Sequence, residues 1–141
     1  MIGWRETELI DPAAESFKFL IKQDTKLLAR EIVRTAKHLA LARVIRKYNL
    51  KPEMIDWYLP HYSSGYFRDK FYNGMKEIHF EIPYEKWFTN LTTKGNSGSA
   101  SIFIIMEELF HSGRLKKDQK LLCFIPESGR FSHCYMMLTV V

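Results

Sequence analysis

Short apolar runs alternate with amphipathic helical stretches along this chain, and that alternation is the strongest constraint on its fold. Apolar runs at 17–22, 55–59, 87–91, 120–125 and 132–140 predict strands, and the stretches at 25–48, 64–75 and 99–111 predict helices. Their order is strand, helix, strand, helix, strand, helix, strand, strand. It predicts an α/β fold, in which helices cover a mixed sheet that ends in an antiparallel hairpin.

The longest of the predicted helices has clear ends and a wide apolar arc. It begins near Asp24, a residue suited to capping, and Asn49 marks its end. The width of the apolar arc indicates that much of the helix is buried. Arg30, Arg34 and Lys37 fall on the remaining basic face, for which an ordinary solvated surface is the expectation.

Length and charge place the chain among single-domain globular proteins. The 141 residues divide into an irregular lead-in at 1–16 and one domain at 17–141, and 46% of them are hydrophobic. The net charge of +5 suits an acidic partner, but no run of like charge indicates nucleic-acid binding. Two cysteines make no disulfide framework, so we expect a reducing, cytoplasmic compartment. We expect neither a membrane span nor a metal site.

Two polar residues follow predicted strands at points where a helix begins next. His61 follows the run at 55–59, and Asn96 follows the run at 87–91, in a glycine-containing loop where Ser97 or Ser99 could cap the next helix. Ligands bind at the carboxyl ends of strands in open α/β sheets. An imidazole and a carboxamide that meet there could both donate hydrogen bonds to one developing oxyanion. The alternative is a strand-end histidine and a turn residue without chemistry.

Two motifs in this order carry a resemblance to a known family. They are Ile-Asp-Trp-Tyr-Leu-Pro-His at 55–61 and Lys-Gly-Asn-Ser-Gly-Ser-Ala-Ser at 94–101, and the stretch at 113–122 fits as well. Together they resemble the C-terminal half of β-ketoacyl-acyl-carrier-protein synthase III, within the thiolase-like superfamily. The resemblance covers about residues 17–141. It implies a thiolase-like half: a mixed five-stranded sheet with helices on both faces.

The resemblance also implies an acyltransferase reaction in fatty-acid or related acyl-chain biosynthesis. In the family, an N-terminal half supplies a nucleophilic cysteine that takes an acyl group. A histidine and an asparagine of the C-terminal half bind the thioester carbonyl of malonyl-acyl-carrier protein, promote loss of carbon dioxide and stabilise the enolate for a Claisen condensation. His61 and Asn96 match these two residues. The implied substrates are acyl-CoA or the phosphopantetheine thioester of the carrier, without a further cofactor.

The substrate-binding positions that the resemblance implies are Ser64, Gly95, Ser97 and Arg68. Departures from the family pattern surround them. Residues 62–64 are Tyr-Ser-Ser where the family has Gln-Ala-Asn, and Tyr66 replaces an expected arginine, with Arg68 nearby. The loop at 126–131, glycine-rich in the family, has one glycine here. These departures leave the acyl group and the donor open.

Neither cysteine matches the family nucleophile. Cys123 lies inside an apolar run, which indicates an inert core thiol, and Cys134 adjoins His133, so the two side chains should point to opposite faces of a strand. We therefore expect half of an enzyme, as a fragment or a split subunit, that is inactive alone. The alternative is a non-catalytic thiolase-like module that binds an acyl carrier or a partner subunit.

Three kinds of partner follow from this interpretation. An acidic acyl carrier protein could meet Arg68, Lys70 and Lys76. The missing N-terminal half would pack on helices that lie between the two sheets. The helices at 25–48 and 99–111 look too apolar to face water, so we expect a homodimer or aggregation of the chain in isolation.

Overall fold

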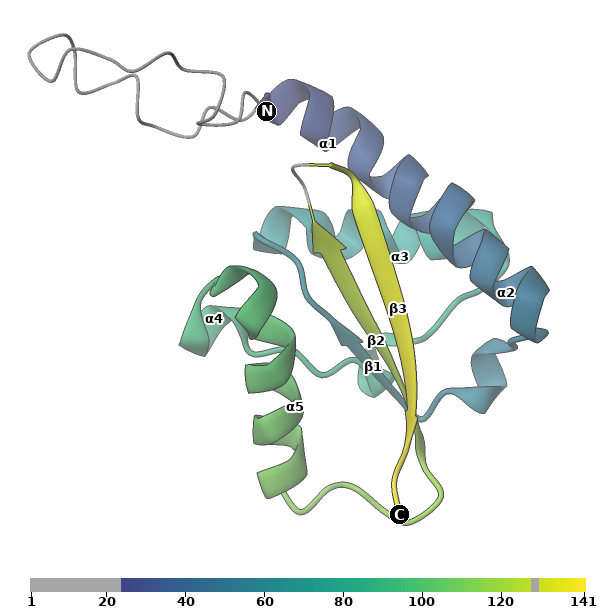
Figure 1. Ribbon diagram of the computed structural model, residues 1–141, viewed down its shortest axis with the longest axis vertical. Helices are drawn as coiled ribbons and strands as arrows, with labels where there is room; N and C mark the ends of the chain where they lie inside the picture. Colours follow the sequence, from purple (N-terminus) through teal and green to yellow (C-terminus); the bar gives the residue numbers. More distant parts are fainter. Residues whose placement is uncertain (1–23, 128–129) are drawn as a thin grey trace, which may run out of the picture.

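The computed structural model describes residues 24–127 and 130–141, and a three-stranded sheet lies at its centre (Figure 1). The strands are β1 (Trp57–Pro60), β2 (Lys120–Glu127) and β3 (Ser132–Thr139), in the order β1-β2-β3. β1 runs parallel to β2, and β3 runs antiparallel to β2. The mixed sheet and the closing hairpin that the sequence predicts are therefore confirmed.

A continuous helix from residue 25 to residue 48 covers one face of the sheet. Its three parts are α1 (Thr25–Val33), the π-helical segment η3 (Arg34–Leu41) and α2 (Ala42–Tyr48). Asp24 caps its start, where a side-chain oxygen accepts from the backbone N–H of Leu27 at 2.9 Å. Asn49 ends it in the left-handed conformation, with φ of 48°. Both predicted ends are confirmed.

The remaining helical elements are shorter. They are η4 (Pro52–Met54), η5 (Gly65–Phe67), α3 (Arg68–Glu77), η6 (Tyr84–Lys86), α4 (Leu91–Lys94), η7 (Gly98–Ala100) and α5 (Ser101–His111). The predicted helix at 64–75 is present as a 3-10 turn that leads into α3. The predicted helix at 99–111 is present as η7 followed by α5.

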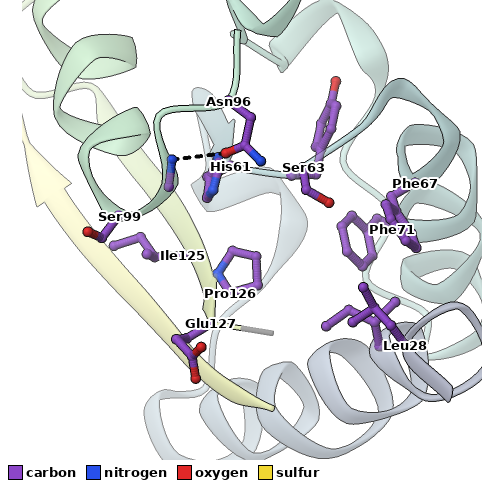
Figure 2. Close-up of a pocket in the computed structure, with 13 residues that line it drawn as sticks. Leu28, His61, Ser63, Phe67, Phe71, Asn96, Ser99, Ile125, Pro126 and Glu127 are labelled. Carbon is purple, nitrogen blue, oxygen red and sulfur yellow. Dashed lines mark hydrogen bonds between the residues drawn. The ribbon is translucent and has the colours of Figure 1, made fainter. Parts of the chain in front are cut away.

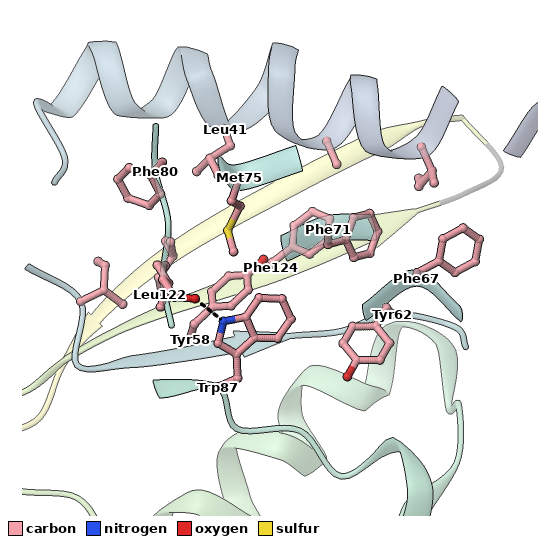
Figure 3. Packing of buried hydrophobic residues seen from close by; sticks show 14 of the residues in the cluster. Leu41, Tyr58, Tyr62, Phe67, Phe71, Met75, Phe80, Trp87, Leu122 and Phe124 are labelled. Atoms are coloured by element: carbon pink, nitrogen blue, oxygen red, sulfur yellow. Dashed lines mark hydrogen bonds between the residues drawn. The ribbon is translucent and has the colours of Figure 1, made fainter. Parts of the chain in front are cut away.

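The two faces of the sheet carry two separate apolar clusters. Tyr58, Leu122 and Phe124 face the 25–48 helix and α3, and Figure 3 shows this cluster beneath the long helix. Leu59, together with residues of β2 that point the other way, packs against α5. Because successive strand residues point to opposite faces, the four-residue β1 serves both clusters. The expected covering of both faces by helices is confirmed.

The expectation of five strands is not met in the described part of the chain. The predicted strand at 17–22 lies outside the described residues. The predicted strand at 87–91 is reduced to one bridge between Trp87 and Tyr58, with the Phe88 N–H donating to the Tyr58 carbonyl at 2.9 Å. Asn90 ends the extended conformation, because its carbonyl already accepts from Lys94 at 2.8 Å in the first turn of α4. A helix therefore begins where a strand was expected.

Lys37 was expected on the solvated basic face, and this expectation is wrong. Its side chain is fully buried between the long helix and the sheet. Arg30 and Arg34 remain at the surface, where both bind the carboxylate of Glu31, at 3.0 and 2.7 Å. The error has a geometric cause: a π-helical segment has more residues per turn than an α-helix, so spacing rules based on 3.6 residues misplace the side chains beyond Val33.

Gly74 of α3 allows the two helices on this face to approach closely. A Cβ atom at this position would lie 2.5 Å from Cγ1 of Val33 and 3.2 Å from Cγ of Lys37. These contacts lie inside the buried cluster, where neighbouring side chains have little room to move. The glycine is therefore required by the helix–helix contact rather than by its own backbone conformation.

We expect Gly74→Ala to lower the free energy of unfolding by about 1–3 kcal/mol, as overpacking does elsewhere, despite the higher helix propensity of alanine. Urea unfolding of the variant measures this change. Gly65→Ala is the matched control, because a Cβ atom there meets nothing within 4 Å. We expect the control to stay within about 0.5 kcal/mol of the parent. Equal stability of all three proteins would contradict the described approach of the two helices.

Candidate functional site

A cavity of about 330 Å³ opens beside the carboxyl ends of β1 and β2 (Figure 2). Five segments of the chain contribute to it: α1, the segment after β1, α3 with η5, the loop around η7, and the end of β2. The lining residues are Leu28, Ile32, His61, Tyr62, Ser63, Phe67, Phe71, Asn96, Gly98, Ser99, Ile125, Pro126 and Glu127. This is the edge of the sheet at which α/β proteins bind ligands.

His61 reaches the cavity because it directly follows β1. Its backbone N–H donates to the carbonyl of Phe124 at 2.9 Å, which extends the parallel pairing of the two strands. The residue is 7% exposed, and burial lowers the pKa of its imidazole below the usual value. The imidazole is therefore neutral at pH 7 and carries one N–H donor and one acceptor nitrogen.

Asn96 reaches the same cavity from the loop between α4 and η7. Gly95 takes a conformation that favours glycine, with φ of 74°, and ends α4. The side-chain oxygen of Asn96 then accepts from the Gly98 N–H at 3.0 Å, as Figure 2 shows by a dashed line. This turn uses the amide oxygen and leaves the amide nitrogen as the part of the side chain that can donate to a ligand.

The structure brings together two of the six predicted site residues, His61 and Asn96. The other four are outside the cavity lining, which contains their neighbours Ser63, Gly98 and Ser99 instead. Of these four, Gly95 shapes the loop, as described above. Ser64 caps η5, where its hydroxyl oxygen accepts from the Tyr66 N–H at 3.3 Å.

The remaining two predicted site residues outside the cavity lining are Ser97 and Arg68. The expected capping by the side chain of Ser97 or Ser99 is wrong. The Ser97 N–H instead donates to the hydroxyl of Ser101 at 2.9 Å, and neither η7 nor α5 has a side-chain cap. Arg68 lies at the surface, with its guanidinium 4.1 Å from the ring centre of Tyr84.

The apolar wall of the cavity was not identified as part of a site from the sequence. Figure 2 shows Leu28, Phe67 and Phe71 gathered on one wall. The i, i+4 spacing of the two phenylalanines predicted a core stripe, and both are indeed buried. The spacing shows which residues are buried, but it carries no sign that the buried stripe also borders a cavity. Glu127, at the end of β2, lines the cavity as well.

The two cysteines lie in different surroundings, and both are away from the cavity lining. Cys123 is fully buried under α5, and burial raises the pKa of its thiol to about 12. Cys134 is exposed. His133 points to the other face of β3, where its Nε2 lies 2.9 Å from the hydroxyl of Thr35. The expected absence of a cysteine–histidine pair at 133–134 agrees with this geometry.

In residues 24–127 and 130–141, no three histidine, cysteine, aspartate or glutamate side chains are grouped so that they could hold a metal ion. Within the same residues, we find no helix with both the length and the apolar character needed to cross a membrane.

A family model, 3-oxoacyl-(acyl-carrier-protein) synthase III C terminal, matches residues 45–126, more than half of the chain. A synthase III of Prochlorococcus marinus is 32% identical over 76 residues, which cover 54% of this chain and 21% of that protein. A synthase III of Clostridium perfringens is 32% identical over 108 residues, or 77% of this chain and 28% of that protein. The chain thus spans less than a third of the length of these relatives.

The crystal structure of a 3-oxoacyl-(acyl carrier protein) synthase III from Pseudomonas aeruginosa has the same fold over most of this chain. The TM-score is 0.72 with 16% sequence identity, and the match covers 93% of this chain and 39% of that one. At this identity the likeness concerns the fold alone. It confirms the thiolase-like α/β class that the sequence resemblance implies.

The surroundings of the two cysteines give a direct prediction about their reactivity. At pH 8, iodoacetamide should alkylate Cys134 in the folded chain and leave Cys123 unmodified, because the thiolate is the reactive form. Intact-mass spectrometry counts the adducts, and Cys134→Ser should take up none. Unfolding in urea should expose both thiols of the parent chain. Rapid alkylation of Cys123 in the folded Cys134→Ser variant would contradict its described burial.

Proposed function

The chain belongs to the 3-oxoacyl-(acyl-carrier-protein) synthase III C-terminal family, and we propose that it contributes His61 and Asn96 to a decarboxylative Claisen condensation in acyl-chain biosynthesis. The observation that carries this proposal is that the two residues, which lie on separate segments of the chain, line one cavity. In the proposed complex, a malonyl thioester occupies the cavity. Its carbonyl oxygen accepts hydrogen bonds from both side chains.

The chemistry of the two donors supports this role. Loss of carbon dioxide from a malonyl thioester leaves an enolate, whose negative charge develops on the carbonyl oxygen. A neutral imidazole N–H and an amide N–H, held in place before the reaction, stabilise that charge without reorganising. The lowered pKa of His61 keeps the imidazole neutral, so it donates without releasing a proton. The loop conformation at Gly95 and Gly98 fixes the amide.

The apolar wall supports a thioester as the ligand. Leu28, Ile32 and Phe71 border the cavity opposite a small number of polar groups, which is the usual composition of a small-molecule site. Apolar surroundings exclude water and strengthen the hydrogen bonds to the developing oxyanion. Among the positions that depart from the family pattern, Tyr62, Ser63, Pro126 and Glu127 line this cavity, so we place the specificity for the acyl group there.

The nucleophile of the proposed reaction would come from outside this chain. Cys123 is buried with a raised thiol pKa, and Cys134 is an exposed residue of β3 outside the cavity lining. We propose that an N-terminal half, on the same polypeptide or on a separate subunit, supplies the acyl-cysteine. The chain spans 21–28% of the two curated relatives described above, which leaves room for such a half.

A second candidate function is a non-catalytic module that binds a partner subunit. Phe103 and Phe110 of α5 are 65% and 69% exposed, which is unusual for phenylalanine. Phe110 also lines a groove of about 390 Å³, whose surface is almost entirely apolar and includes Met106 of α5 and Leu138 of β3. This surface suits a protein partner, either the missing half or a second copy of the chain.

We also place the docking of an acidic acyl carrier protein on the outer surface of α3. Arg68, Lys70 and Lys76 lie there, each with its cationic group over an aromatic ring: Tyr84 at 4.1 Å, Tyr66 at 4.4 Å and Tyr72 at 5.6 Å. Stacking on rings holds these long side chains in defined positions.

We expect His61→Ala and Asn96→Ala each to weaken binding of S-acetyl-pantetheine by up to about tenfold, the effect of one lost hydrogen bond of about 0.5–1.5 kcal/mol. Titration followed by NMR measures the affinity. His111→Ala is the matched control, because His111 is an exposed residue at the end of α5. The affinity of this variant for the probe should equal that of the parent. Unchanged affinity in both site variants would contradict the proposed oxyanion site.

We expect the isolated chain to form a homodimer or larger assembly through α5, because the phenylalanines there are exposed. The sequence also suggested the long helix, whose outward face carries the exposed Leu39 together with charges such as Arg30 and Arg43, so we place the contact on α5. Light scattering coupled to size exclusion measures the mass. The double variant Phe103→Glu/Phe110→Glu should be monomeric. A monomeric parent that binds no apolar dye would show that α5 needs no partner.

A further inference from the structure

Lys37 is a fully buried lysine at the centre of the π-helical segment η3. Its amine donates to the hydroxyl oxygen of Tyr58 on β1 at 2.8 Å and to that of Tyr135 on β3 at 3.2 Å. The nitrogen lies 3.9 Å from the ring centre of Phe124. Through these contacts the long helix is connected to all three strands, on the face of the sheet that it covers.

The groups that face the Lys37 amine are uncharged. From β1 and β3 these are Tyr58, Tyr135 and His133, and from β2 and α3 they are the rings of Phe124 and Phe71. Gly74 of α3 lies against the stem of the lysine. On its own helix, the neighbouring His38 turns outward to Glu77 at 2.8 Å. Among the described residues, no carboxylate forms an ion pair with Lys37.

Lys37 is buried without a neighbouring carboxylate, and this environment determines its charge. The ring faces of Phe124 and Phe71 attract a cation, but this attraction is small beside the free energy of removing an ammonium from water. Burial therefore holds the pKa of Lys37 well below its usual range. A neutral amine has two N–H groups, and Tyr58 and Tyr135 accept both. The Tyr135 hydroxyl in turn donates a hydrogen bond to the carbonyl of Ala36 at 2.9 Å.

Lys37 is connected to the cavity through three elements. The helix that carries Lys37 also carries Leu28 and Ile32 of the cavity wall. The ring of Phe71, another part of that wall, lies 4.8 Å from the amine. Tyr58 belongs to the strand that leads directly to His61. π-Helical turns inside longer helices are found frequently at functional sites.

We propose that uptake of a proton by Lys37 opens segment Arg34–Leu41 and loosens the wall of the cavity. In this account the cavity is fully formed only while the amine is neutral and bonded to both tyrosines. Lys37 is thus a positioning residue, because it acts on the ligand site through the helix, Phe71 and β1. Only the identity of the cavity ligand rests on the proposed function; the proton-linked opening stands on the contacts of Lys37 itself.

The direction of the pH effect follows from linkage. When the segment opens, Lys37 returns to water and to a pKa of about 10.4, so the open form binds one proton that the closed form does not. A decrease in pH therefore raises the open population, by at most about tenfold per pH unit for one proton. Exposed histidine changes charge near 6.5 and exposed tyrosine near 10, both outside the range from pH 7 to pH 9. The thiol of Cys123 lies on the opposite face of the sheet, in the cluster under α5.

Hydrogen exchange followed by mass spectrometry tests the proposal. We expect the protection factor of segment Arg34–Leu41 to rise from pH 7 to pH 9, by at most about tenfold per pH unit. Lys37→Met keeps the apolar stem and should remove the pH dependence. Lys26→Met is the matched control, because Lys26 is an exposed lysine of the same helix, and it should behave like the parent. A protection factor independent of pH in the parent chain would overturn the proposal, whether or not Lys37→Met folds.

A second arm tests the link to the cavity with S-acetyl-pantetheine as the probe. The His61 ring signals in NMR report whether the probe binds, independently of exchange. If it binds and protection of segment Arg34–Leu41 rises, the link between Lys37 and the cavity is supported. If it binds without a change in protection, the link is overturned. If it does not bind at any pH, the proposed function fails, while the pH dependence still decides whether proton uptake opens the segment.

Discussion

The parallel pairing of β1 with β2 is the constraint on which the rest of the structure depends. β1 has only four residues, yet Tyr58 and Leu59 send side chains into the clusters on both faces. The pairing continues through the His61 N–H to Phe124, which fixes where the strand ends and the cavity begins. A parallel pair needs a crossover between its strands, and here that crossover includes α3, α5 and the loop that carries Asn96. One pairing thus determines both the sheet and the meeting of the two site residues.

Much of this arrangement can be predicted from the sequence, because the relevant signals are local. Asp24 and Asn49 end the long helix by capping, and the spacing of Phe67 and Phe71 places α3 against the core. The position of His61 after an apolar run predicts a strand-end site. In each case, one short stretch contains the whole physical reason for the structure.

Features that depend on several segments could not be predicted in this way. The burial of Lys37 needs a π-helical segment and two tyrosines from different strands, and no short stretch contains all of these. The strand expected at 87–91 yields to a helix, because the carbonyl of Asn90 accepts within the first turn of α4. In the sequence, the cavity wall cannot be distinguished from an ordinary core stripe. The spacing of Phe67 and Phe71 predicts that both are buried, but not that they border an open space.

The central claim is that His61 and Asn96 act together on one ligand atom. A crystal structure of the chain with bound S-acetyl-pantetheine tests it most directly. We expect the thioester carbonyl oxygen within hydrogen-bond distance, about 3 Å, of both a His61 ring nitrogen and the Asn96 amide nitrogen. A thioester bound in the cavity with its carbonyl turned away from either residue would contradict this joint role, as would a thioester bound elsewhere on the chain.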